Sequence, residues 1–280
     1  MSTKKSTFLW LDTALYVIVF LLVQAITFVV VGQFFPNVVN NPTALVVSTS
    51  ASNILLVLLF MLLRWSPFSR DYIRSRPWGV FAWTCVLAFG TIIPSMFIEE
   101  LMGLELTEAE EQLFRNLMST PWGYLAVGIL APLAEEMVFR GALLRTLLIL
   151  FGRQTVLFSS MPRWMRVWLP IVLSALVFGS IHGNLAQGIH ATLIGLLLGW
   201  LYWRSGSIVP GLVFHWVNNS VAYACVRIWP GLTDVSLLDL CGGSYLRVLL
   251  YVGFSLMVFL PALYQLHLRM KKNYLRESIK

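Results

Sequence analysis

The stretch that decides the fold is Ala134-Glu135-Glu136-Met137-Val138-Phe139-Arg140-Gly141, which places two carboxylates and a guanidinium inside an apolar run. A helix over that run, from about Tyr124 to Phe151, is about 40 Å long and can cross a bilayer. Ionised groups at membrane depth are costly, so they face a protein interior or a wet cavity and mark function. Glu136 and Arg140 are four residues apart, which favours an ion pair on one helix face. Glu135 points about 100° away from Glu136 and is free for another role.

The composition of the chain is that of a membrane protein. Hydrophobic residues make up 58% of the sequence and charged residues only 12%, with a mean hydropathy of +0.77, which excludes an ordinary soluble domain. We therefore expect an all-α, polytopic bundle of about eight transmembrane helices, forming one integral membrane domain over residues 1–280. Basic loops and anionic lipid headgroups explain the net charge of +7, so no nucleic-acid partner is expected.

Eight apolar runs mark the expected spans. They cover about Phe8–Val31, Ala44–Leu63, Trp78–Ile98, Tyr124–Phe151, Val167–His182, Leu185–Trp203, Ile208–Ile228 and Tyr245–His267. An acidic segment before Pro121 is expected to form a short surface helix ending near Ser119. When alternate loops are placed on opposite sides, most basic residues fall on one side. The expected location is the bacterial inner membrane, with both termini in the cytoplasm.

Polar side chains also stand inside the later spans. His182 follows Phe178 by four residues. His215 precedes Asn219 by four, so these two side chains share one helix face. A structural explanation exists for each group alone: a histidine can join two helices by a hydrogen bond, and the two acids can simply share Arg140. Two histidines and an asparagine beside a charged helix favour chemistry instead.

A glutamate and two histidines can hydrolyse a bond in two ways. Glutamate and histidine can act as general bases on water, while other polar groups stabilise an oxyanion. Alternatively, Glu135, His182 and His215 can hold a zinc ion that acidifies the water. Asn219 shares a helix face with His215, and an amide is a poor zinc ligand but a good donor to an oxyanion. The sequence therefore favours chemistry without a cofactor and leaves zinc as the alternative.

Three motifs on successive apolar helices resemble those of a known family. They are Glu135-Glu136-x-x-x-Arg140, Phe178-x-x-x-His182 and His215-x-x-x-Asn219, in this order. Together they resemble the CPBP family, the CAAX-protease and bacteriocin-processing group of intramembrane endopeptidases, also called the Abi family. The resemblance covers about Pro121 to Ala222, which is therefore the expected catalytic core.

The resemblance implies a role for each motif residue. Glu135 with His182 would activate water, while His215 and Asn219 would stabilise the tetrahedral oxyanion. Glu136 and Arg140 would support the site by orientation and charge balance. His190 matches no motif position and is interpreted as a helix-packing or cavity residue.

The predicted function is that of an intramembrane endopeptidase whose substrates are membrane-associated or lipidated proteins or peptides. The alternative is a non-catalytic transporter or scaffold with a polar binding cavity. Many transporters are built from two related halves that both contribute polar groups at mid-membrane. In this chain the polar groups gather in the second half, which favours the enzyme.

Overall fold

The computed structural model describes residues 3–67, 69–103, 107–152, 161–229 and 235–270, and every regular element in these ranges is helical. The all-α prediction is therefore confirmed. The longer helices are α1 (Thr3–Phe34), α2 (Pro42–Leu62), α4 (Trp78–Phe89), α5 (Ile92–Leu101), α6 (Glu108–Met118), α10 (Met165–Ser180), α11 (Leu185–Ser205), α12 (Val209–Ile228) and α14 (Tyr245–Arg269). Short helices are η1 (Val38–Asn40), α3 (Arg70–Arg74) and α13 (Leu237–Leu240).

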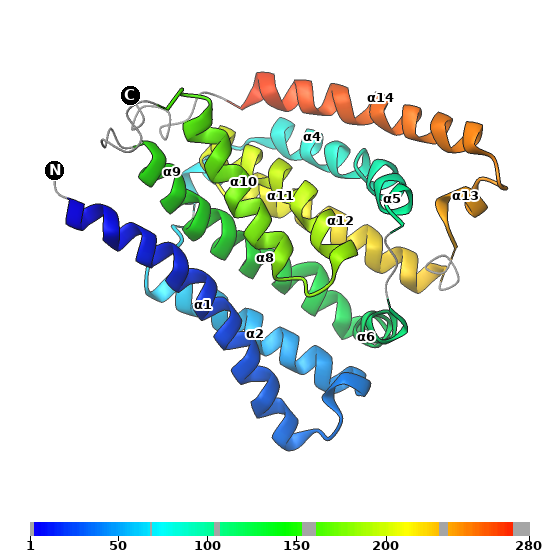
Figure 1. Cartoon of the computed structure of the whole chain (residues 1–280), viewed down its shortest axis with the longest axis horizontal. Helices are drawn as coiled ribbons and strands as arrows, with labels where there is room; N and C mark the ends of the chain where they lie inside the picture. Colours follow the sequence, from blue (N-terminus) through cyan, green and yellow to red (C-terminus); the bar gives the residue numbers. More distant parts are fainter. Residues whose placement is uncertain (1–2, 68, 104–106, 153–160, 230–234, 271–280) are drawn as a thin grey trace.

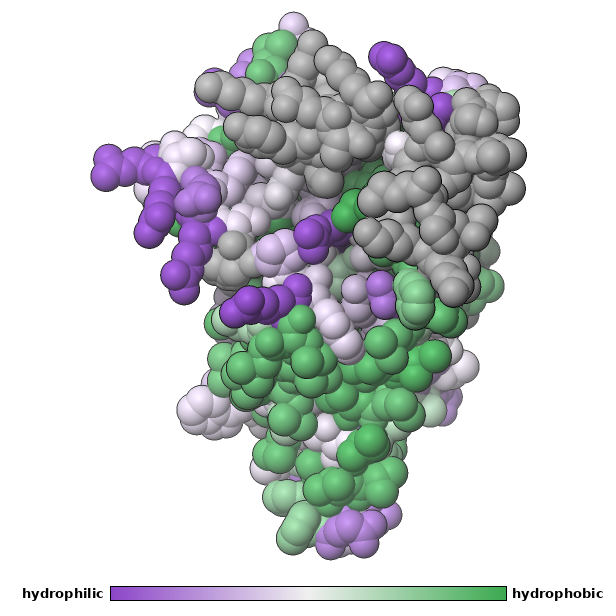
Figure 2. All heavy atoms as spheres, turned by 90° about the vertical axis from the view of Figure 1, so that its left-hand side faces the viewer, coloured by the Kyte–Doolittle hydropathy of each residue, from purple (hydrophilic) through white to green (hydrophobic). Residues whose placement is uncertain are grey.

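Five helical stretches are long and apolar enough to cross a membrane. They are Phe8–Phe34, Pro42–Leu62, Trp78–Leu101, Leu185–Ser205 and Tyr245–Arg269. The large apolar side chains of α1 are exposed along most of its length, and Figure 2 shows a broad hydrophobic surface where the α1–α2 hairpin lies. The protein is therefore an integral membrane protein. Helices also occupy the other three predicted spans, but these are shorter or more polar.

The fourth predicted span is helical throughout but not α-helical throughout. It consists of α7 (Pro121–Gly123), η2 (Tyr124–Leu130), α8 (Ala131–Glu135), η3 (Glu136–Leu144) and α9 (Arg145–Gly152), of which η2 and η3 are π-helices. Pro132 lacks a backbone N–H, and its ring disturbs the preceding α-helical turn. The wider turns of η2 accommodate that defect ahead of the acidic pair. Such π-helical segments frequently occur at functional sites.

Helices α10 and α11 form the tightest pair in the bundle because glycines line their contact. A Cβ atom on Gly195 would lie 3.1 Å from Ala175 Cα, and one on Gly199 would lie 2.8 Å from Ile171 Cγ2. The spacing of these glycines predicted this close packing. The connection between the helices is a short turn in which Gly183 has a φ of +80°, a conformation that glycine adopts without strain.

The fifth predicted span has the expected length, but it begins and ends two residues earlier than predicted. Helix α10 has 16 residues, so it is only about 24 Å long and does not cross a ~30 Å hydrocarbon core. It ends at Ser180, and His182 lies in the turn that follows rather than in the helix. Because the helix stops inside the bundle, His182 is held at the depth of the other polar groups. This corrects the predicted boundary at His182.

The ends of the helices separate the charged segments. The start of α1, the end of α9 and the end of α14 lie toward one end of the molecule, whereas α6 and α13 lie at the other (Figure 1). Arg204 at the end of α11 donates to Met270 O at 3.0 Å, so it belongs to the first end. At the opposite end, Glu100 accepts a hydrogen bond from Leu237 N at 2.6 Å. The basic residues after 270 that entered the prediction lie outside the described residues.

The acidic surface helix forms as predicted. Thr107 and Glu110 make a reciprocal capping box at the start of α6, and Ser119 follows its end. The hydrogen bonds from Thr107 to the exposed Glu110 carboxylate lower the pKa of that group from its ordinary value. When the pH falls through that lowered pKa, the Glu110 carboxylate is protonated and the cap is weakened. The start of α6 is therefore most stable above the ordinary pKa of glutamate.

Membrane sidedness is testable by reporter fusions. We expect fusions after Arg76, Arg163 and Lys280 to report the cytoplasmic side and one after Glu110 to report the opposite side, because basic loops are retained in the cytoplasm. A paired alkaline phosphatase and green fluorescent protein series at these positions would measure this. A fusion after Lys280 that is active only outside would contradict the predicted topology.

Candidate active site

The predicted ion pair of the fourth span is present. Arg140 Nη1 donates to Glu136 Oε1 at 2.8 Å, and the two side chains are 1% and 0% exposed. Arg140 Cζ also lies 4.2 Å from the centre of the Phe178 ring, whose face attracts cations. Glu136 Oε2 and Arg140 Nη2 find no hydrogen-bond partner among the described residues. Solvent therefore does not reach the pair. Each of the two charges is compensated by the other.

Glycines on the neighbouring helices make room for this pair. A Cβ atom on Gly211 of α12 would lie 2.7 Å from Glu136 Oε2, and one on Gly195 of α11 would lie 3.4 Å from Arg140 Nη2. A larger residue at Gly211 would therefore displace the Glu136 carboxylate. Helices α11 and α12 therefore pack against the ion pair at glycine positions, where they carry no side chain.

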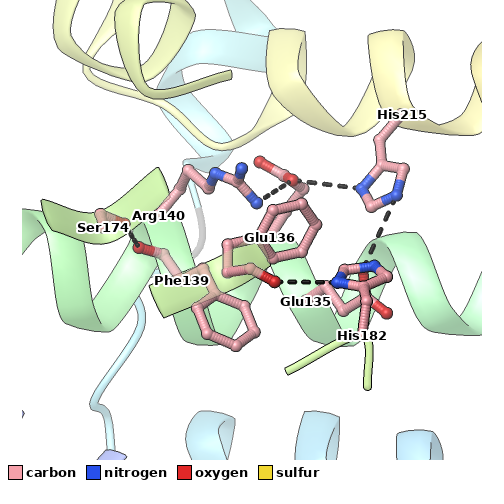
Figure 3. Close-up of polar contacts among 8 residues, drawn as sticks. Glu135, Glu136, Phe139, Arg140, Ser174, His182 and His215 are labelled. Atoms are coloured by element: carbon pink, nitrogen blue, oxygen red, sulfur yellow. Dashed lines mark hydrogen bonds and ion pairs between the residues drawn. The ribbon is translucent and has the colours of Figure 1, made fainter. Parts of the chain in front are cut away.

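His215 lies between the two carboxylates, as Figure 3 shows. Its Nδ1 atom is 3.3 Å from Glu136 Oε1, and its Nε2 atom is 3.7 Å from Glu135 Oε2. An ionised carboxylate only accepts hydrogen bonds, so Nδ1 must carry the proton in the contact with Glu136. The buried ion pair therefore orients the ring and turns Nε2 toward Glu135. At 3.7 Å, Nε2 and Oε2 are not directly hydrogen bonded, so both can contact a third group.

His182 reaches the same place from the turn after α10. Its Nδ1 atom is 2.8 Å from Phe178 O, and because a carbonyl only accepts, Nδ1 is the donor. Nε2 is then the nitrogen with a free lone pair. The Phe178 ring contacts both histidines edge to face, with its centre 5.0 Å from that of His182 and 5.9 Å from that of His215. Within the described residues, no hydrogen bond or ion pair joins His182 to Glu135.

Asn219 lies one helical turn beyond His215 on α12. Its Nδ2 atom donates to Val127 O in the π-helical segment η2, at 2.9 Å. This bond uses one of the two amide N–H groups and fixes the side chain against the fourth span. The second N–H remains for another acceptor.

A single cavity of about 1470 Å³ connects these groups. Glu135, His182, His215 and Asn219 all line it. Glu135 is 16% exposed and His215 is 8% exposed, whereas Glu136 is completely buried behind the wall. The four residues predicted to be catalytic therefore share one space, and the two predicted to support them lie outside it.

His190 also lines the cavity, as one of its two interpretations expected. Its Nδ1 atom is 2.6 Å from Glu99 Oε1 of α5, with both side chains about one-third exposed. Neither residue bonds to Glu135, His182 or His215 in the described structure. The pair joins α11 to α5 at the cavity wall.

The alternative zinc set is not assembled. Among the described residues, no three His, Cys, Asp or Glu side chains are grouped so that they could hold a metal ion. Of the proposed ligands, His215 is close to Glu135. The bond from His182 Nδ1 to Phe178 O leaves Nε2 open, an orientation that metal-binding histidines also use. What counts against zinc is therefore only the grouping of the described side chains, and zinc stays the alternative.

Sequence reasoning missed the part of the site that comes from the first two helices. The cavity is also lined by α1 and α2, through residues that include Gln24, Ser48, Thr49, Ser52 and Asn53. The signal was available in the sequence, because these are polar residues inside two strongly apolar spans. No motif marks them, and only the packing of α2 against α8 and η2 brings them to the cavity.

Comparison with known proteins finds a family model that matches the segment carrying the three motifs. Residues 116–221 match the family model described as "Rce1-like: Type II CAAX prenyl endopeptidase Rce1-like". Comparisons with curated proteins and with solved structures gave no match. The matched region begins in α6, ends in α12 and includes all three motifs recognised in the sequence. Residues 116–221 are therefore similar to the Rce1-like type II CAAX prenyl endopeptidases of the CPBP/Abi family, the family that the three motifs resemble, and this similarity implies a peptidase.

Proposed function

We propose that the protein is an intramembrane endopeptidase that hydrolyses peptide bonds of membrane-associated or lipidated polypeptides. The observation that carries the proposal is the meeting of Glu135, His182, His215 and Asn219 on one cavity. A carboxylate, two imidazoles and an amide supply both the bases and the donors that amide hydrolysis needs.

Water activation is assigned to Glu135 and His182. Because His182 donates through Nδ1, its Nε2 lone pair accepts a proton from water, and the Glu135 carboxylate is the second acceptor in the cavity. The hydroxide then attacks the carbonyl carbon of the scissile bond. When the intermediate collapses, the same groups return the proton to the leaving amine. The donor assignments of the two histidines support this division of roles.

Oxyanion stabilisation is assigned to His215 and Asn219. In its doubly protonated form, His215 donates Nδ1–H to Glu136 and directs Nε2–H to the cavity beside Glu135. Asn219 contributes the N–H that Val127 O does not use. One such donor accounts for roughly 10²–10³ in rate. The Glu136–Arg140 pair acts through His215 by holding its ring, so both residues are positioning residues.

The test is comparative proteomics of membranes that contain either wild-type protein or Glu135→Gln. We expect uncleaved precursors of particular membrane proteins to accumulate with Glu135→Gln, and their new amino termini to appear only with the wild type. Glu108→Gln is the control, because Glu108 is an exposed residue of α6 outside the cavity. Identical patterns of amino termini in wild type and Glu135→Gln would overturn the proposed function.

Metal removal should leave the activity intact. Because the cavity residues are not arranged as a zinc site, we expect dialysis against a chelator to change the cleavage rate by less than about twofold, since none of the assigned steps uses a metal. The measurement combines elemental analysis of the purified enzyme with its rate before and after chelation. Stoichiometric zinc whose removal abolishes cleavage and whose return restores it would favour the metal-dependent alternative.

A further inference from the structure

The part of the cavity wall that α2 forms carries a polar stripe. Four polar residues of α2 line the cavity: Ser48, Thr49, Ser52 and Asn53. Ser48 and Ser52 are one helical turn apart, as are Thr49 and Asn53, so the four share one face. This face packs beside α8 and η2, which carry Glu135 and the backbone that holds Asn219.

Asn53 carries the amide of this stripe. It is only 3% exposed and lines the cavity. Its amide atoms are not among the buried polar atoms that lack a partner, so the amide faces the cavity. Its neighbour Ser52 differs, because the Ser52 hydroxyl donates to Thr49 O at 3.0 Å. Thr84 of α4 is likewise satisfied within its own helix, by Val80 O at 2.8 Å. The Asn53 amide is instead available to a molecule in the cavity.

The chemistry of the Asn53 amide suits the backbone of a peptide. An amide side chain has an acceptor oxygen and two N–H donors, which complement both the N–H and the C=O of an extended chain. The stripe also has the right spacing. Residues four apart on a helix are separated by about 6 Å along its axis, and alternate residues of an extended chain by about 6.6 Å.

We propose that Asn53 hydrogen bonds to the backbone of the substrate peptide and holds it in an extended conformation against Glu135, His182 and His215. The inference rests on the proposed function, because it names how the same site binds its substrate. Asn53 lies outside the matched residues 116–221. In this proposal, α2 contributes to substrate binding. The segment that matches the family contributes the catalytic residues.

The test uses Asn53→Leu, which has a similar volume and no polar atoms, and Asn53→Ala as a second variant. The probe is an internally quenched peptide ending in a farnesylated CAAX sequence, together with its unlipidated twin. For whichever peptide the wild type cleaves faster, we expect the KM of both variants to rise about 10-fold while kcat stays within about twofold, since the lost contact is a binding contact. The melting temperature of Asn53→Leu should stay close to that of wild type, because the Asn53 amide faces the cavity and is not a partner in the hydrogen bonds of the described residues.

Two controls separate this assignment from a structural role and from the proposed function. Thr84→Val removes a buried hydroxyl that is satisfied within α4, and it should leave KM unchanged. Glu135→Gln, measured in parallel, should lose cleavage altogether. Unchanged KM in both Asn53 variants, a fall in kcat alone, or a lower melting temperature with normal KM would each overturn the role of Asn53 while leaving the proposed function in place. A wild type that cleaves neither peptide would overturn both.

Discussion

Glu135→Gln is expected to reduce peptide cleavage by about 10²–10⁴-fold, the contribution of a general base. Glutamine keeps the size of the side chain but cannot take a proton from water. Glu135 makes no short hydrogen bond among the described residues and is partly exposed to the cavity, so its replacement should leave the fold intact. The measurement is kcat of purified enzyme in liposomes, with the melting temperature as the check on folding.

His182→Ala tests the same step, the activation of water. If Glu135 and His182 act together on one water molecule, their effects are not additive, and the double variant should be about as slow as the slower single variant. The exposed Glu108→Gln should behave as wild type. Wild-type turnover by a folded Glu135→Gln enzyme would show that Glu135 is not the base.

Arg140→Met is expected to lower the free energy of unfolding by about 3–5 kcal/mol, because it leaves the Glu136 carboxylate buried without its partner. Glu136 is completely buried, and a glycine of α12 rather than a polar side chain faces its second oxygen. Solvent therefore cannot compensate for the lost cation. The measurement is unfolding in mixed micelles followed by circular dichroism.

The matched control is the exposed pair Arg74–Asp71, whose atoms are 3.7 Å apart on α3. Arg74→Met should change stability by less than about 1 kcal/mol, as for other surface pairs. The double variant Glu136→Gln/Arg140→Met should recover part of the loss, because no uncompensated charge remains. Equal effects of Arg140→Met and Arg74→Met would contradict the structural role given to the buried pair.

The sequence predicted those parts of the site that depend on spacing along one helix. Glu136 and Arg140 pair because they are one turn apart, and Glu135 points elsewhere for the same reason. Hydropathy predicted helices at all eight expected positions, of which five are clearly long and apolar enough to span a membrane. Local periodicity and composition were sufficient for these conclusions because each concerns a single segment.

The contacts between helices could not be predicted in this way. Spacing gave no indication that His215 lies between Glu135 and Glu136, since 79 residues separate it from Glu136. The expected pairing of Glu135 with His182 came from a family resemblance, and in the described structure the residue that approaches Glu135 is His215. The early end of α10 also depends on tertiary packing, which places the His182 turn inside the bundle.

The division between matched and unmatched segments has a functional consequence. The family match covers residues 116–221, whereas α1 and α2 lie outside it and still form one wall of the cavity. The proposals assign the chemistry to the matched segment and part of the substrate selection to α1 and α2, which lie outside it. Exchanging α1 and α2 for other helices would be expected to change which peptides bind before it changes the hydrolytic step.

The most direct test of the central claim is mass spectrometry of the products that the liposome-reconstituted enzyme forms in water enriched in heavy oxygen. The substrates are the farnesylated CAAX peptide and its unlipidated twin, incubated with wild type or Glu135→Gln. The account predicts that the wild type produces a new carboxyl terminus carrying one heavy oxygen atom, and that Glu135→Gln produces none above the uncatalysed background. A wild type that generates no new termini, or a folded Glu135→Gln enzyme that generates them at the same rate, would contradict it.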